Sequence, residues 1–292
     1  MNPAYPLLTI LTYSFLYLSV IFLWIPVFKK IPLWALILAV STVCGLLGNR
    51  LEPISIVFIL LLFMFTHYLQ NQQSPGWARV LSALALFFLG GALEMHLLPG
   101  FHNLQVLDKV HISEHGIPFS LYLNFDKTLV GIVILGTLHS LITSQDEWRK
   151  MFKIMLPLAC LVIFIIALLS FLFNFVSFDP KLPDSLLIWA STNLLLVCVA
   201  EEGFFRGFIQ QYLSLLFDRI KYGDLLAILI ASSLFGLAHY SGGGLYVILA
   251  MVAGMGYGFI YVRTKRIEAS ILTHFLLNLV HYLLFTYPAL ST

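Results

Sequence analysis

The sequence is poor in charge, and this shortage excludes broad classes of protein. Only 10% of the 292 residues are charged, 60% are hydrophobic, and the formal net charge is +2. A soluble domain needs a larger charged surface, so this composition is typical of a polytopic membrane protein. The small net charge also gives no basic surface for nucleic acid, and we expect no nucleic-acid partner.

Cysteine is scarce as well, and two common protease motifs are missing. Cys44, Cys160 and Cys198 all lie in apolar stretches without Cys-x-x-Cys spacing, which favours neither a disulfide framework nor a metal site. His-Glu-x-x-His, the helical motif of many zinc proteases, is absent. A Gly-x-Ser-Gly nucleophile is absent too, so a serine mechanism is not favoured.

Long polar segments are rare, and apolar stretches near bilayer length follow one another along the chain. They lie at 6–27, 32–49, 53–70, 78–98, 128–143, 151–177, 185–217, 225–240, 244–263 and 267–286. We therefore expect an all-α fold, a polytopic transmembrane helical bundle of about ten spans (eight to ten). The first stretch lacks a small-residue cleavage site, which predicts a retained helix.

The distribution of basic residues predicts an orientation in the membrane. Lys and Arg cluster in alternate loops, which should be cytoplasmic, so both chain termini should lie outside. These clusters are Lys29–Lys30, Arg79, Arg149–Lys150–Lys153, Arg219–Lys221 and Arg263–Lys265–Arg266. The segment 99–127 should then be an extracytoplasmic loop. It holds His102, His111 and His115, which we interpret as part of an interfacial loop and not as a metal site.

Three charged residues lie in an apolar stretch, in Ala200–Glu201–Glu202–Gly203–Phe204–Phe205–Arg206. A charge at bilayer depth costs about 2.5–3.5 kcal/mol on insertion scales, so charged residues at this depth are rare and usually have a function. In a helix Glu202 and Arg206 are i and i+4 and share a face, which suits a supporting ion pair. Glu201 points about 100° away and needs a partner from another helix. We interpret Glu201 as a residue retained for chemistry.

Two later helices are interrupted by further polar positions, each within a pair at i, i+4 spacing. These pairs are Phe235 with His239 and His274 with Asn278. Together with Glu201 they suit the hydrolysis of a peptide by activated water. A glutamate and a histidine activate the water, and His239 later passes a proton to the leaving amine. His274 and Asn278 can donate hydrogen bonds to the oxyanion, which is typically worth about 2.7–4 kcal/mol per donor.

The ordered motifs Glu-Glu-x-x-x-Arg, Phe-x-x-x-His and His-x-x-x-Asn resemble the CPBP family. That family comprises CAAX prenyl endopeptidases and bacterial relatives linked to bacteriocin processing and immunity. The resemblance covers about residues 185–285. It implies an intramembrane protease with Glu201 as the base, His239 as its partner on the water, and His274 and Asn278 as the oxyanion site. It also implies Glu202–Arg206 as the supporting ion pair.

The resemblance also suggests a class of substrate, but it says nothing about the first half of the chain. Residues 1–150 should form N-terminal membrane helices with the extracytoplasmic loop 99–127, and residues 151–292 the protease core. The substrate should be a prenylated C-terminal tail or a membrane-delivered peptide, met in the lipid bilayer. A multi-pass protein of the bacterial inner (plasma) membrane is expected.

Three alternatives stay open. We expect no cofactor and no metal, because a metal-free mechanism gives Asn278 a role, but Glu201, His239 and His274 together are an alternative zinc site. A proton-coupled transporter also uses intramembrane Glu, Arg and His. Transporters usually repeat interrupted helices in two halves, whereas the polar residues here crowd into the last third. A non-catalytic immunity or binding protein of the same fold is the third alternative.

Overall fold

The structure, a computed structural model, describes residues 6–25, 32–71 and 73–291. Within these ranges seven helices are long and apolar enough to cross a membrane. They are Leu7–Trp24, Pro53–Gln70, Gly76–Glu94, Gln145–Leu172, Leu186–Leu216, Gly244–Thr264 and Ile267–Leu284. Length and composition thus fit a multi-pass membrane protein.

Two shorter apolar helices, Leu33–Leu47 and Gly223–Ala238, accompany these seven. The expected stretch 128–143 forms a helix of only 14 residues, Phe125–Leu138. The number of eight to ten spans is therefore not confirmed and stays a prediction. Lys29–Lys30 and the end of the expected first span lie outside the described residues.

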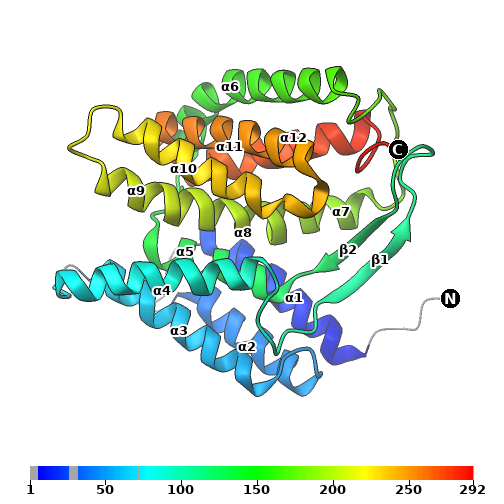
Figure 1. The fold of residues 1–292 in the computed structure, drawn as a ribbon. Helices are drawn as coiled ribbons and strands as arrows, with labels where there is room; N and C mark the ends of the chain where they lie inside the picture. Colours follow the sequence, from blue (N-terminus) through cyan, green and yellow to red (C-terminus); the bar gives the residue numbers. More distant parts are fainter. Residues whose placement is uncertain (1–5, 26–31, 72, 292) are drawn as a thin grey trace. The chain divides into compact units, whose positions relative to one another are not determined.

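The expectation of a purely α-helical fold was wrong in one segment. Strands β1 (Leu104–Val110) and β2 (Phe119–Leu123) pair in a two-stranded sheet within the expected loop 99–127. They run in opposite directions in Figure 1. The turn signals Gly116 and Pro118 separate two short stretches rich in Val, Leu, Phe and Tyr, which is the composition of a hairpin.

The chain divides into two compact units, each assembled from separate stretches. Unit 1 comprises 1–104, 123–143 and 195–204, and unit 2 comprises 105–122, 144–194 and 205–292. These units are defined by packing, and their boundaries differ from the expected division into residues 1–150 and 151–292. That division separates the N-terminal helices from the expected protease core, and it stays a prediction.

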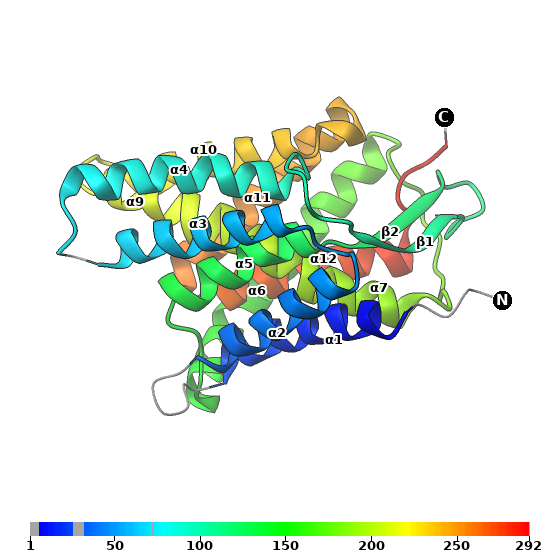
Figure 2. The ribbon, with the colours of Figure 1, turned by 90° about the horizontal axis from the view of Figure 1, so that it is seen from below.

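Unit 1 is built around α5 (Phe125–Leu138). Helices α1 (Leu7–Ile21) and α2 (Leu33–Leu47) pack along each other, as do α3 (Pro53–Gln70) and α4 (Gly76–Glu94). Figure 2 shows α1 beside α2. Helix α5 contacts α1, α3, α4 and the short helix α8 (Val199–Glu202), and its residues from Thr128 to Leu135 are all buried. A helix that is apolar all round is buried all round, which explains the central place of α5 in this unit.

Unit 2 is built around α11 (Gly244–Thr264). It packs against α6 (Gln145–Leu172), α10 (Gly223–Ala238) and α12 (Ile267–Leu284), as Figure 1 shows. The hydroxyl of Ser144 caps the start of α6 by accepting a hydrogen bond from the backbone N–H of Glu147. Between α10 and α11 the backbone turns at Gly243, whose φ of +88° is favourable for glycine. Because α10 and α12 both pack against α11, the helices that carry the Phe-x-x-x-His and His-x-x-x-Asn motifs lie near each other in this unit.

The segment Leu186–Leu216 changes helix type four times. It runs through α7 (Leu186–Thr192), the π-helical η2 (Asn193–Cys198), α8, the π-helical η3 (Gly203–Gln210) and α9 (Gln211–Leu216). π-Helical turns are rare, usually single, and frequent at functional sites. The two π segments flank Glu201 and Glu202, so the helix is irregular on both sides of the acidic pair.

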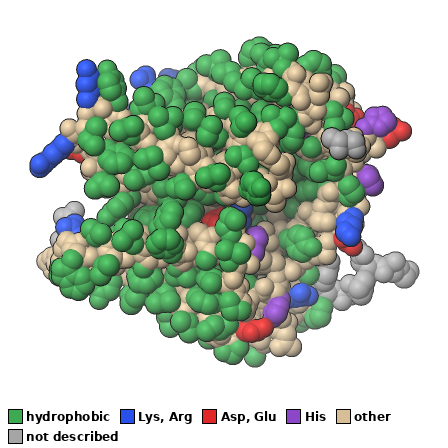
Figure 3. All heavy atoms as spheres, in the orientation of Figure 1, with side chains coloured by type: hydrophobic (Ala, Val, Ile, Leu, Met, Phe, Trp, Pro, Cys, Tyr) green, Lys and Arg blue, Asp and Glu red, His purple; other side chains and the backbone are tan. Residues whose placement is uncertain are grey.

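The outward-facing side chains of the helices are largely apolar. Phe88 on α4 is 69% exposed and Phe164 on α6 is 64% exposed. Hydrophobic side chains cover most of the face drawn in Figure 3. Such surfaces are costly in water and suit contact with lipid, while the helices satisfy their backbone hydrogen bonds internally.

Candidate active site

Unit 2 contains a cavity lined by helices α6, α10, α11 and α12. Its polar lining includes His239, His274, Asn278 and His281, and most of the remaining lining is aliphatic or aromatic. The cavity offers about 80 Å³ to the centres of water molecules. One buried water needs roughly 10–15 Å³ on this measure, so the cavity can hold water beside an apolar group.

His239 stands at the end of α10. The helix ends at Ala238, and the ring of His239 lies 4.6 Å from the ring of Phe235, as the i, i+4 spacing predicts. Its Nδ1 lies 2.7 Å from the carbonyl oxygen of Phe235 and donates to it. In a neutral imidazole this contact makes Nε2 the nitrogen with the lone pair. The end of α10 therefore fixes both the ring and its tautomer.

His274 and Asn278 come from α12, one helical turn apart. The ring of His274 stacks on Tyr257 of α11 at 4.8 Å and 19°, and it meets the edge of Phe235 at 5.7 Å. Asn278 Nδ2 donates to Asn193 Oδ1 at 3.2 Å, where Asn193 begins η2. Aromatic packing thus holds the histidine, and a side-chain hydrogen bond orients the asparagine amide.

Arg206 is fully buried in unit 2. Its guanidinium carbon lies 4.4 Å from the centroid of Phe235 and 5.2 Å from that of Tyr257, which are cation–π distances. The lack of a side chain at Gly254 makes room, because a Cβ there would lie 2.7 Å from Arg206 Nη2. Arg206 therefore packs against the same aromatic rings that hold His239 and His274.

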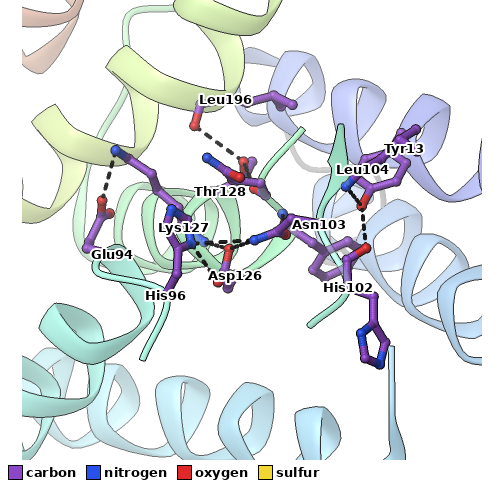
Figure 4. Close-up of polar contacts among 12 residues, drawn as sticks. Tyr13, Glu94, His96, His102, Asn103, Leu104, Asp126, Lys127, Thr128 and Leu196 are labelled. Carbon is purple, nitrogen blue, oxygen red and sulfur yellow. Dashed lines mark hydrogen bonds and ion pairs between the residues drawn. The ribbon is translucent and has the colours of Figure 1, made fainter. Parts of the chain in front are cut away.

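The acidic pair belongs to unit 1, where both side chains are buried. Glu201 forms an ion pair with Lys127 of α5. Lys127 Nζ also lies 3.7 Å from Glu94 Oε2 at the end of α4, a contact drawn in Figure 4. Within this unit Glu201 thus does have a partner from another helix, as its offset from the Glu202 face predicts.

The predicted site residues fall into two sets. In unit 2, His239, His274 and Asn278 line one cavity, with Arg206 packed beside their aromatic neighbours. Glu201 and Glu202 lie in unit 1. The ion pair of Glu202 with Arg206, and the roles of all six residues, stay predictions.

The sequence analysis missed four residues around these sets: Glu94, Lys127, Asn193 and Tyr257. Glu94 and Lys127 carried a usable signal, since an ionisable residue at an apolar helix is a functional candidate by default. Asn193, a polar residue in an apolar stretch, carried the same kind of signal. Tyr257 carried none, because aromatic residues are abundant throughout the chain.

The histidines of the 99–127 segment make separate contacts. His102 Nε2 lies 2.8 Å from Glu52 Oε1, in unit 1, whereas His111 Nδ1 donates to the carbonyl of Gly116 in unit 2. Ser291 donates to the backbone carbonyl of His115. The interpretation as an interfacial segment stays a prediction.

The donor set of the cavity does not fit a zinc site. His239 and His274 line the cavity, but none of its described lining residues is Asp, Glu or Cys. More generally, residues 6–25, 32–71 and 73–291 contain no group of three His, Cys, Asp or Glu side chains placed to hold a metal ion. We therefore derive no step through a metal, and metal independence stays a prediction.

Comparison with known families agrees with the motifs. Residues 183–280 match the family model described as type II CAAX prenyl endopeptidase Rce1-like. The match spans every motif residue from Glu201 to Asn278, so the resemblance to CAAX prenyl endopeptidases is confirmed for this stretch. Searches of curated proteins and of solved structures gave no match. With seven apolar helices and a membrane-protease family match, the chain is an integral multi-pass membrane protein.

Proposed function

Because residues 183–280 match a CAAX prenyl endopeptidase family, we propose that the chain is an intramembrane endopeptidase that uses activated water. The observation that carries this proposal is the cavity of unit 2, where three motif residues meet in an apolar setting: His239, His274 and Asn278. A pocket of apolar side chains with a few convergent polar groups is the usual form of a binding site.

The proposed mechanism assigns one role to each motif residue. Glu201 accepts a proton from a water molecule that His239 holds, and the water oxygen forms a bond to the scissile carbonyl carbon. His274 and Asn278 donate hydrogen bonds to the oxyanion. The proton then moves from Glu201 to His239 and from His239 to the leaving amine as the carbon–nitrogen bond breaks. Glu202 and Arg206 form the supporting ion pair.

The proposed substrate is a prenylated or membrane-delivered peptide. Apolar side chains such as Leu249, Ala253 and Leu277 line the cavity beside its polar residues, and they suit an apolar group held next to a peptide bond. The exposed apolar helix faces fit a protein that meets its substrate in the bilayer. The proposed location is the bacterial inner (plasma) membrane.

Cleavage of a defined peptide tests the proposal. Purified protein in lipid vesicles is incubated with a peptide that ends in a farnesylated CAAX tail and with the same peptide lacking the farnesyl group. Mass spectrometry should find the C-terminal tripeptide released by the wild type and not by Glu201→Gln or His239→Ala. His67→Ala, which removes a histidine from helix α3 of unit 1, is the matched control and should cleave normally.

The two peptides also separate the substrate classes. Cleavage of the farnesylated peptide alone supports a prenylated substrate, and cleavage of both supports a membrane-delivered peptide without prenyl recognition. Full activity of Glu201→Gln would contradict the mechanism. Lack of cleavage by the wild type on any membrane peptide would favour a non-catalytic protein.

A further inference from the structure

Unit 1 holds a cluster of three charged residues that includes the candidate base, two of them buried carboxylates and one a partly buried lysine. Lys127 pairs with Glu201 and lies 3.7 Å from Glu94. The exposed side-chain fractions of Lys127, Glu94 and Glu201 are 14%, 5% and 7%. The ammonium group of Lys127 thus forms ion pairs with two buried carboxylates, Glu94 at the end of α4 and Glu201 in α8.

Close helix packing fixes the place of Lys127 relative to Glu201. One residue after Lys127, the hydroxyl of Thr128 lies 3.3 Å from the carbonyl oxygen of Leu196 and donates to it across the helices. One turn after Lys127, an added Cβ at Gly131 would lie only 2.6 Å from the Cα of Ala200. Residues four apart share a helix face, so Lys127 and Gly131 face the same neighbour. Helix α5 therefore approaches the segment before Glu201 at backbone distance.

A second set of contacts fixes the first turn of α5. Asn103 Nδ2 donates to Asp126 Oδ1 at 3.0 Å, and Asn103 Oδ1 accepts from the backbone N–H of Phe125 at 2.8 Å. His96 Nδ1 lies 2.8 Å from Asp126 Oδ2. Figure 4 shows these side chains around the start of the helix. The backbone that carries Lys127 is thus fixed by its packing against residues 196–200 and by the contacts of the first turn of α5.

From this geometry we propose that Lys127 is a positioning residue for Glu201 and that Glu94, as a second carboxylate beside the ammonium group, helps to hold it in place. The inference rests on the proposed role of Glu201 as the base. An ammonium group beside a buried carboxylate favours the anion, which is the form that accepts a proton from water. Lys127 and Glu94 lie outside residues 183–280, so the site would include residues from the N-terminal half of the chain.

Variants that separate charge balance from positioning test the proposal. Lys127→Met leaves two buried carboxylates without their cation, whereas Lys127→Met/Glu94→Gln restores the formal net charge of the wild-type cluster. Lys127→Arg keeps the cation but not the compact ammonium contact. Arg266→Met, which removes the partner of Glu147 in unit 2, is the control for losing an ion pair elsewhere. Melting temperature, kcat and KM are measured on the farnesylated peptide or on whichever peptide the wild type cleaves.

We expect Lys127→Met to have a lower melting temperature, since a partner of a buried ion pair is lost. The double variant should regain the melting temperature but keep a kcat about 10²-fold below the wild type, with little change in KM, because misplaced catalytic groups act on the chemical step. Lys127→Arg should have an intermediate kcat, and Arg266→Met should keep the wild-type kcat.

Two results would overturn the positioning role while leaving the protease intact. One is a wild-type kcat in any folded variant that lacks a cation at position 127. The other is a wild-type kcat in Lys127→Arg, which decides the matter if the methionine variants do not fold. A wild type that cleaves no peptide would instead overturn the proposed function, and the role of Lys127 would fall with it.

Discussion

His274 and Asn278 lie one turn apart on α12, and both line the cavity of unit 2. Aromatic stacking on Tyr257 holds the histidine, and Asn193 accepts a hydrogen bond from the asparagine. An asparagine is neither a base nor a good metal ligand, so its substitution should have different effects under an oxyanion mechanism and under a zinc mechanism.

At this scale we predict that Asn278→Ala lowers kcat by roughly 10²–10³, with little change in KM, because such donors act mainly in the transition state. The variant should keep the wild-type melting temperature. Single-turnover kinetics on the purified variant measure the effect, and metal analysis of the wild type accompanies them. Stoichiometric zinc together with an active Asn278→Ala protein would contradict the assignment.

Within each unit, a glycine allows close packing beside charged site residues. In unit 1, Gly131 of α5 meets the backbone of Ala200, next to Glu201. In unit 2, Gly254 of α11 leaves room for the guanidinium group of Arg206. Both contacts are closer than any side chain would allow, so both glycines set the positions of charged residues.

At the scale of the element we predict that Gly131→Ala destabilises the protein by about 1–3 kcal/mol, because the new methyl group meets backbone that cannot move aside. The displaced helix should also weaken the contact of Lys127 with Glu201 and lower kcat. Thermal unfolding in detergent and peptide cleavage measure the two effects. A Gly131→Ala protein with wild-type stability and activity would show that α5 and α8 are not packed at this distance.

Gly76→Ala is the matched control for that substitution. Gly76 begins α4, and a Cβ there meets nothing within 4 Å among the described residues. Alanine has the higher helix propensity and restricts the unfolded chain, so this variant should be neutral or stabilising by up to about 1 kcal/mol. Its kcat should equal that of the wild type.

At the scale of the whole molecule, seven long apolar helices span most of the described chain, and the basic residues between them predict its orientation. The hairpin formed by β1 and β2 belongs to the segment predicted to lie outside. Lys150 and Lys153 lie in the first turns of α6, and this end of the helix should lie in the cytoplasm.

Accessibility to a membrane-impermeant thiol reagent tests this orientation. In a background with Cys44, Cys160 and Cys198 replaced by alanine, Glu114→Cys, at an exposed position between β1 and β2, should react from outside intact cells. Lys150→Cys should react only after the cells are opened. The opposite labelling pattern would reverse the orientation, and equal labelling of both would show that the predicted loops do not lie on opposite sides.

The sequence by itself determined the properties that depend on composition and on local spacing. A high apolar content over stretches near bilayer length indicates membrane helices, because each crossing must bury its backbone polar groups within a helix. The i, i+4 spacing placed Phe235 with His239 and His274 with Asn278 on common faces, and the order of the motifs carried the family resemblance. The i, i+4 spacings lie within about one helical turn, and the motif order is a property of the sequence alone, so neither depends on the rest of the fold.

Only the tertiary structure decided which distant residues meet. Lys127 and Glu201 lie 74 residues apart in sequence, and their ion pair depends on the approach of α5 to α8 at Gly131. The stacking of Tyr257 on His274 depends in the same way on how α11 packs against α12. The π-helical segments around the acidic pair and the hairpin within 99–127 also escaped the sequence analysis. Long-range packing selects the distant residue pairs and the π-helical segments among several conformations that local propensity permits, so no local pattern predicts them. The hairpin does have local turn signals, at Gly116 and Pro118, which the sequence analysis did not use.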